Sequence, residues 1–368
     1  MQLASIEVIP YALPFKEPYV TARGTLTQRE MVLLRLTTDE GFVALGEAVP
    51  LSLRGGASIE QVVRELREVD ESRVLHDLVT RGELEYGGAT MIDPRLQLSP
   101  PSLAAVLGAI FDLCAKLEAE ADGDAGRTDG DPDRGVRCNA TLVAGEPAAV
   151  GAQALRWAEE GFSTFKLKLG LGDDVGQVRA VREALGPGVT IRVDANAAWS
   201  LDTATATLLA LESLDLELAE QPVATMREAA ELSRRISIPL AGDESIVTKA
   251  DAVEAVRLNA FHLAGVKLSK VGGVFPALEI AEVMPAYVSS ALDGPVGIAA
   301  GAMLAHSFDL EATMREEPPL AHGLATQRLF ASTIAAVGCE LRGGMLHLPP
   351  GPGLGVEIDE DALQAHRL

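Results

Sequence analysis

The chain has 368 residues, 48% of them hydrophobic, and a formal net charge of −22. A surface this acidic repels nucleic acid and anionic membranes, so we expect neither as a partner. No apolar run reaches the roughly 18 residues of a membrane-spanning helix, and the amino terminus lacks the pattern of a signal peptide. Three widely spaced cysteines form neither a disulfide framework nor a zinc motif, which favours the reducing cytoplasm.

The first 130 residues predict a small α+β domain, because expected strands are followed by expected helices. Pro10 and Pro14 confine the first strand to a sheet edge or mark its end, since proline cannot donate a backbone hydrogen bond. Ser58 and Gln61 have the spacing of a capping box, which begins a helix. The expected elements are strands over 2–12, 31–37 and 42–47 and helices over 59–66 and 102–118.

A change of pattern near residue 130 predicts a domain boundary there. Residues 120–135 are dominated by Asp, Gly, Arg and Pro, which is typical of a mobile link. From 131 to 330, short apolar strands alternate with helical stretches, which predicts a barrel of strand-and-helix units. The Gly/Pro-rich tail over 331–368 is expected to return to the first domain. The expected barrel strands are 136–143, 162–169, 189–195, 215–220, 238–243, 261–267, 286–292 and 321–325.

Five charged residues recur along the barrel at intervals of 26, 26, 23 and 24 residues. Each one ends a short apolar run that predicts a buried strand. The carboxyl ends of barrel strands converge on one rim, so we expect these side chains to share a site. The five residues are Lys168, Asp194, Glu220, Asp243 and Lys267.

The residue types on this rim predict a metal and a base. Taken singly, each carboxylate could be a helix cap or a loop residue. Together, three like charges repel one another without a cation, and hard carboxylate oxygens suit Mg²⁺, with Mn²⁺ as an alternative. Lys166 lies two residues before Lys168 and therefore projects from the same face of the strand. A neighbouring cation lowers the pKa of a lysine, so we expect Lys168 to act as a base.

Two further segments offer candidate site residues. In the segment VKLSKVGG we expect Lys267 to point inward and Lys270 to be solvated in the turn. In SSALDGPVGIAAG, Ser289 and Ser290 end a strand, and glycines open a helix whose backbone N–H groups could hold a substrate carboxylate. A tight packing turn explains this segment equally well. No dinucleotide-binding GxGxxG, P-loop or GxSxG motif is present, and the six histidines form no ligand pair.

The motifs KxK, DAN, EQP, DES and VKxxKxGG, in this order, resemble the muconate-lactonizing branch of the enolase superfamily. The resemblance implies an α/β fold: a modified TIM barrel, (β/α)7β-like, with an amino-terminal α+β capping domain that the carboxyl-terminal tail completes. It also implies that Asp194, Glu220 and Asp243 bind Mg²⁺. Lys168 and Lys267 would then face opposite sides of the substrate α-carbon, with Lys166 tuning Lys168. The segment AYVSSALDG lacks the histidine that marks the mandelate racemase branch.

The resemblance further implies abstraction of a proton α to a carboxylate, giving an enediolate, from a small-molecule substrate bound by a homo-oligomer. The segments SSALD, GIAAG and HGLAT resemble o-succinylbenzoate synthases, which dehydrate their substrate. Asp293-Gly294 stands where that family often has Glu-Ser. Asn196, Ser289, Ser290 and Asp293 are the candidate substrate contacts, under loops expected over 19–30 and 50–56.

Alternatives to dehydration remain open on the sequence. A racemase of N-acylamino acids or an epimerase of dipeptides comes second, although MREEPPLAHGL lacks the Asp-x-Asp that dipeptide epimerases usually carry. Muconate cycloisomerisation comes third. A non-catalytic barrel that binds a ligand would be favoured by the loss of any of the five charged residues, and all five are present.

Overall fold

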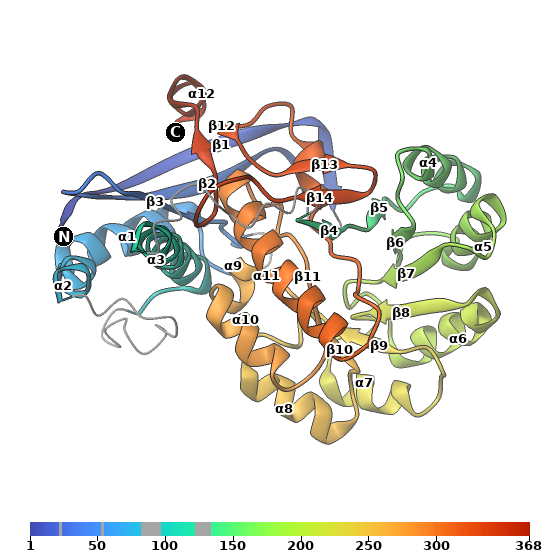
Figure 1. The fold of residues 1–368 in the computed structure, drawn as a ribbon. Helices are drawn as coiled ribbons and strands as arrows, with labels where there is room; N and C mark the ends of the chain where they lie inside the picture. The colour runs from blue at the N-terminus through green and yellow to red at the C-terminus, as the bar shows by residue number, and fades with distance from the viewer. Residues whose placement is uncertain (22–23, 53–54, 82–96, 122–133) are drawn as a thin grey trace.

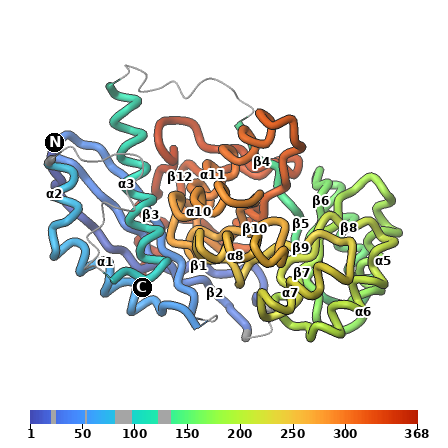
Figure 2. Tube along the Cα trace, turned by 90° about the horizontal axis from the view of Figure 1, so that it is seen from below, coloured from blue at the N-terminus to red at the C-terminus, as the bar shows by residue number. Residues whose placement is uncertain are grey.

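The computed structural model describes residues 1–21, 24–52, 55–81, 97–121 and 134–368. A small antiparallel sheet with three helices forms one side of the molecule, and a curved parallel sheet wrapped by helices forms the other (Figure 1). Figure 2 shows α10 (Val274–Ala281) and α11 (Pro295–Met314) between these two parts. The predicted link overlaps residues 122–133, which lie outside the described residues, so the division into domains stays a prediction.

The amino-terminal sheet has the strand order β1-β2-β3. Its strands are β1 (Leu3–Thr21), β2 (Gly24–Thr38) and β3 (Val43–Ala48). The first two strands are longer than predicted, because the hairpin continues past a register shift between Pro14 and Tyr19 that reads as a loop in the sequence. The predicted edge position of the first strand is confirmed. On that edge the carbonyls of Pro10 and Pro14 accept hydrogen bonds from Leu368 and Ala331 of the tail.

Three helices cover one face of this sheet (Figure 1). They are α1 (Ile59–Ser72), α2 (Val74–Arg81) and α3 (Pro100–Ala121). Side chains of β2 alternate between two cores: Leu34 packs with the helices, and Leu33 packs with the barrel. Ser58 caps α1 as predicted, accepting a hydrogen bond from the Gln61 backbone N–H. The Gln61 side chain donates to Glu65.

Seven parallel strands form the curved sheet in the order β11 to β5, and each neighbouring pair is consecutive in the chain. The strands are β5 (Ala140–Leu142), β6 (Thr164–Lys168), β7 (Thr190–Asp194), β8 (Leu216–Glu220), β9 (Leu240–Gly242), β10 (Leu263–Val266) and β11 (Ala286–Val288). The helices that follow or precede them are α4 (Pro147–Glu159), α5 (Asp174–Leu185), α6 (Leu201–Leu211), η3 (Glu212–Leu214), α7 (Met226–Ser233), α8 (Lys249–Leu258) and α9 (Leu268–Val271). Helices α4 to α8 lie outside the strands (Figure 1), so side chains on the inner face are enclosed.

The barrel closes without the eighth strand that the sequence predicts over 321–325. His322 and Gly323 instead form single-residue parallel bridges with Cys138 and Ser289. The 3-10 helix η4 (Ala325–Leu329) begins two residues later, which leaves no length for a strand. One-residue bridges, each with two backbone hydrogen bonds, therefore join the two ends of the curved sheet.

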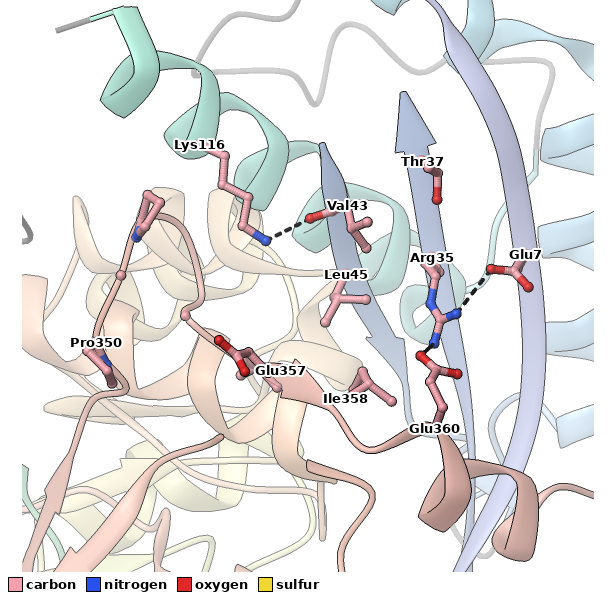
Figure 3. Close-up of a pocket in the computed structure, with 14 residues that line it drawn as sticks. Glu7, Arg35, Thr37, Val43, Leu45, Lys116, Pro350, Glu357, Ile358 and Glu360 are labelled. Atoms are coloured by element: carbon pink, nitrogen blue, oxygen red, sulfur yellow. Dashed lines mark hydrogen bonds and ion pairs between the residues drawn. The ribbon is translucent and has the colours of Figure 1, made fainter. Parts of the chain in front are cut away.

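The carboxyl-terminal tail contacts both parts of the molecule. Its elements are β12 (Ala335–Val337), β13 (Glu340–Arg342), β14 (Met345–His347), β15 (Glu357–Ile358) and α12 (Glu360–His366). One strand from outside the tail, β4 (Gly135–Arg137), pairs with it. Strand β14 pairs with β4 beside the barrel, and Arg367 bridges Tyr11 in the first sheet. Arg35 of β2 pairs with Glu360 of the tail at the edge of a hollow of about 460 Å³ (Figure 3).

The buried carboxylate of Asp112 joins three segments at the side of this hollow. It accepts hydrogen bonds from the backbone N–H of Leu45 in β3 at 2.9 Å and of Leu354 in the tail at 2.7 Å. Lys116, one turn further along α3, pairs with it at 2.8 Å and also donates to the Val43 carbonyl (Figure 3). The side chains of α3 therefore satisfy the open edge of β3.

Replacing Asp112 with Ala is expected to lower the free energy of unfolding by about 3 kcal/mol, because two buried N–H groups lose their acceptor. Urea denaturation of the variant measures the loss. The matched control is Glu279→Ala, which removes an exposed carboxylate from α10 and is expected to change stability by no more than about 0.5 kcal/mol. Equal stability of the two variants would contradict the role of Asp112.

No helix in the described part of the chain is both long enough and apolar enough to cross a bilayer.

Candidate active site

The five charged residues predicted to share a rim lie at the carboxyl ends of five neighbouring strands. Three of them are the last residues of β6, β7 and β8, and the other two directly follow β9 and β10. The sheet register pairs Lys168 with Asp194 and Asp194 with Glu220. Around the rim the order is lysine, three carboxylates, lysine, as it is in the sequence.

Lys166 lies beneath the rim, between two of the carboxylates. Its Nζ is 2.5 Å from Oε2 of Glu220 and 2.9 Å from Oδ2 of Asp194. Burial lowers the pKa of Lys166, but the Asp194 and Glu220 carboxylates outweigh burial and raise it above its ordinary value. Burial alone would raise the pKa of Asp194. The charges of Lys166 and Lys168 outweigh burial and lower the pKa below its ordinary value, so the Asp194 carboxyl group is ionised. Lys166 is thus a fixed cation beside Lys168.

Lys168 is the more accessible lysine of this pair. Its side chain is 27% exposed, whereas that of Lys166 is 5% exposed. Its Nζ lies 2.6 Å from Oδ2 of Asp194 and 2.9 Å from Oδ1 of Asn196. Asn196, in a left-handed turn with φ of 47°, also donates its backbone N–H to Asp194. A molecule on the rim can therefore reach Lys168. Asn196 helps to orient the Lys168 side chain.

The opposite end of the rim holds two lysines on one carboxylate. Lys267 contacts Oδ2 of Asp243, and Lys270 contacts Oδ1 at 2.7 Å. The expectation that Lys270 is solvated is wrong, because its side chain is only 11% exposed and also donates to the Gly265 carbonyl. The short helix α9, which begins just after Lys267, turns Lys270 back toward Asp243. Burial lowers the pKa of Lys270, the Asp243 carboxylate opposes this, and Lys267 adds to the lowering.

The rim carboxylates fit a divalent cation by their chemistry. In the part of the chain that the structure describes, no three Asp, Glu, His or Cys side chains are grouped so as to hold a metal ion. Each rim carboxylate instead has a lysine ammonium group as its cationic partner. Oε1 of Glu220 is buried and has no hydrogen-bond partner among the described residues. Three carboxylates, one with an unsatisfied oxygen, are the donor type that Mg²⁺ prefers, so the fit rests on their chemistry and not on their grouping.

The loop after β11 contains three of the candidate substrate contacts. Ser290 Oγ donates to Asp293 Oδ2 at 2.6 Å and accepts from the Asp293 backbone N–H at 2.9 Å. Asp293 is buried, and its hydrogen bonds come from this loop and from Ser269. Ser289 donates its backbone N–H to the Val266 carbonyl. These contacts order the loop, and its role in substrate binding stays a prediction.

This loop is also tied to the amino-terminal sheet. Arg29 of β2 donates to the carbonyls of Pro50 and Ala291, at 2.8 and 3.1 Å. Glu47 of β3 accepts a hydrogen bond of 2.6 Å from the Gly294 N–H, at the start of α11. The loops expected to cover the substrate, over 19–30 and 50–56, include residues 22–23 and 53–54, which fall outside the description. Arg29, from the first of these segments, contacts the loop after β11, and Pro50, from the second, accepts a hydrogen bond from Arg29.

The buried carboxyl group of Glu47 predicts a pH-dependent stability. Burial, with Asp293 adding to it, raises the pKa of Glu47 to about 7, while hydrogen bonds from Tyr11, Gly294 and Gly297 oppose the shift. Between about pH 4.5 and 7 the folded state keeps a proton that the unfolded state has lost. Stability from this group is therefore greatest at low pH and falls as the pH rises through this window.

We expect the free energy of unfolding of the wild type to fall across that window relative to Glu47→Gln, which cannot titrate. The slope of the difference is at most about 1.4 kcal/mol per pH unit, the value for one proton. Urea denaturation of both proteins at half-unit pH steps measures it. Parallel stability curves would show that the Glu47 carboxyl group titrates normally.

Two buried residues beneath the rim were not identified from the sequence. Tyr287 of β11 donates its hydroxyl to Oε2 of Glu220, and the Arg192 guanidinium lies over the Tyr287 ring, 4.9 Å from its centroid. The signal was available in the strand period, because Tyr287 and Arg192 stand two residues before Ser289 and Asp194 and so project from the inner face. In the sequence alone, both residues stand out only as members of apolar strands.

Comparison with known proteins places this chain in a family. A fragment of 207 residues, 54% of the chain, is 40% identical to the o-succinylbenzoate synthase of Thermobifida fusca and spans 62% of that protein. Over 99% of its length the chain is 26% identical to the N-succinyl-L-Arg/Lys racemase of Bacillus cereus, covering 97% of that sequence.

Solved structures show the same fold over the whole chain. The B. cereus racemase superposes with a TM-score of 0.82 at 24% identity, over 100% of this chain and 98% of that one. A dipeptide epimerase from Cytophaga hutchinsonii, complexed with Mg and the dipeptide D-Ala-L-Val, has a TM-score of 0.81 at 25% identity, over 100% and 98%. The predicted fold class, a modified TIM barrel with a capping domain, is confirmed by these neighbours. Residues 149–362 match the family described as enolase C-terminal domain-like, and the chain belongs to this enolase superfamily.

Proposed function

We propose that the protein is a Mg²⁺-dependent enzyme that abstracts a proton α to a carboxylate and then dehydrates the resulting enediolate. The observation that carries this proposal is the order of side chains around the rim. Lys168 and Lys267 stand at its two ends, and the three carboxylates lie between them. A substrate carbon above the carboxylates would have one lysine on either side, which is the arrangement that proton abstraction with stabilisation of the product anion requires.

The charges of the site favour an anionic substrate. Four lysines line the site, and a bound divalent cation would add to their positive charge, even though the chain as a whole carries −22. A small-molecule carboxylate is the substrate class that such a site attracts. Asn196, Ser289, Ser290 and Asp293 are the residues we propose to contact it.

Asp194, Glu220 and Asp243 are the proposed Mg²⁺ ligands. A bound divalent cation supplies positive charge where the negative charge of an enediolate develops. The fit rests on the oxygen donor set and on the unsatisfied Oε1 of Glu220. The Mg in the C. hutchinsonii epimerase structure supports the same ion here.

The lysines carry the proton steps. The neutral amine of Lys168 takes the α-proton as the C–H bond breaks, and the electron pair passes to the substrate carboxylate. The electron pair then returns to form the C=C bond as the C–O bond breaks, and Lys168, now an ammonium group, gives its proton to the departing hydroxyl group, so the products are an alkene and water. Lys166 stays charged beside Lys168. Lys267 stabilises the enediolate from the other side.

The identity of 40% to an o-succinylbenzoate synthase over about half the chain supports dehydration. The second candidate is racemisation of an N-acylamino acid or epimerisation of a dipeptide, favoured by the match to the B. cereus racemase along nearly the whole chain. That reaction needs proton transfer by both Lys168 and Lys267. Muconate cycloisomerisation comes third.

Incubation in D₂O with Mg²⁺ and a panel of substrates tests the proposal. The panel contains the o-succinylbenzoate synthase substrate, N-succinylamino acids and dipeptides, and both deuterium incorporation and product formation are followed. Dehydration without racemisation is the expected result. Exchange confined to amino-acid derivatives would make the racemase or epimerase the function, and no exchange with any substrate would overturn the enzymatic proposal.

A further inference from the structure

Tyr287 occupies the barrel interior directly beneath the rim. It is fully buried, and its hydroxyl donates to Oε2 of Glu220. The same oxygen accepts from Nζ of Lys166 at 2.5 Å. Two donors therefore hold one oxygen of the Glu220 carboxylate, while the other oxygen, Oε1, is buried with no hydrogen-bond partner among the described residues.

The surroundings of Tyr287 are built for this position. A Cβ atom on Gly265 of β10 would lie 2.9 Å from the Tyr287 hydroxyl and 3.1 Å from Cζ, so the absence of a side chain there makes room for the ring. Arg192 lies over the ring, and its own Nη1 donates to the Ala321 carbonyl at 2.6 Å. The ring is thus confined between two neighbours, and its hydroxyl has little freedom to leave Glu220.

We propose that Tyr287 is a positioning residue that fixes the Glu220 carboxylate so that Oε1 is offered to the divalent cation. This inference rests on the proposed function, because it assumes that Glu220 is a ligand. Hydrogen bonds to the far oxygen of a ligating carboxylate orient it, and their loss typically weakens metal binding about 10- to 100-fold. Tyr287 itself touches neither substrate nor cation.

Calorimetric titration of the full chain with Mg²⁺ alone tests the role of Tyr287, using Tyr287→Phe and a matched control. The Phe variant keeps the ring under Arg192 and removes only the hydroxyl. The control is Tyr11→Phe, which removes another buried hydroxyl that donates to a glutamate, Glu47, at 2.8 Å. We expect Tyr287→Phe to raise the Kd for Mg²⁺ about tenfold and Tyr11→Phe to leave it within about twofold.

A second variant covers the case in which Tyr287→Phe does not fold. Gly265→Ala keeps the hydroxyl but displaces it from Glu220, so we expect the same loss of Mg²⁺ affinity. Because only positioning is lost, raising the Mg²⁺ concentration is expected to restore the activity of either variant. Unchanged Mg²⁺ affinity in the folded variants, or an equal loss in Tyr11→Phe, would overturn the role of Tyr287 and leave the proposed function standing. A wild type that binds no Mg²⁺ would overturn both.

Discussion

Lys168→Ala is expected to lower the turnover number by about 10³-fold or more, which is the scale of a lost general base. Lys168 is the exposed member of the KxK pair and the one that an α-proton could reach. Without its amine, neither proton abstraction nor proton return to the leaving group has a carrier. Product formation and deuterium exchange at the α-carbon, measured with saturating Mg²⁺, should fall together.

Two control variants separate the base from simpler explanations. Lys168→Arg keeps the positive charge beside Asp194 but cannot release its proton near neutral pH, so we expect it to be as inactive as the Ala variant. Lys249→Ala removes a surface lysine of α8 that is 49% exposed and should leave turnover unchanged. Substantial turnover by Lys168→Arg would show that Lys168 acts through its charge.

Removal of divalent cations is expected to abolish the reaction. Treatment of the wild type with a chelator should reduce exchange of the α-proton to the solvent background, and added Mg²⁺ should restore it. Glu220→Gln should not respond to Mg²⁺, because the amide is a weaker ligand for a hard cation. Lys166 keeps Asp194 as a partner in this variant, so the protein is expected to remain folded. Full activity in the presence of chelator would remove the metal from the mechanism.

The rim could be predicted from the sequence because its geometry follows from a local rule. Each of the five rim residues is the last residue of a strand or directly follows one, and these strands are consecutive in the chain. Parallel strands end at the same edge of the sheet. Pairing of consecutive strands brings the five residues together, and their even spacing makes that pairing visible in the sequence. The fold class followed from the same alternation of strands and helices.

Lys270 shows where the local rule fails. The sequence VKLSKVGG predicts a turn, and turn residues are usually solvated. The structure instead forms α9 over Leu268–Val271, four residues long, which brings the lysine back over Asp243. A helix this short gives no periodic signal, since one turn does not repeat.

The loop after β11 depends on contacts that no local pattern carries. Arg29 reaches Ala291 across 262 positions of the chain, and Glu47 reaches Gly294 across 247. Such pairs follow from how the first sheet packs on the barrel. Tyr287 was missed for a related reason: in the sequence it is one aromatic residue among strand residues, and only its neighbours Gly265 and Glu220 make it distinct.

The way the barrel closes implies that its stability against local opening is uneven. β6 and β7 pair over five consecutive residues and lie beside Asp194, whereas His322 and Gly323 close the ring through single bridges. The free energy of local opening should therefore be lower at this closure than in β6 and β7, so backbone amide hydrogens at the closure should exchange with solvent faster. Ser289 and Ser290 belong to the closure, while most of the charged rim belongs to the continuous strands. If Ser289 and Ser290 contact the substrate as proposed, the part of the barrel beside the substrate is the part that can open locally, and the strands that carry most of the charged rim stay closed.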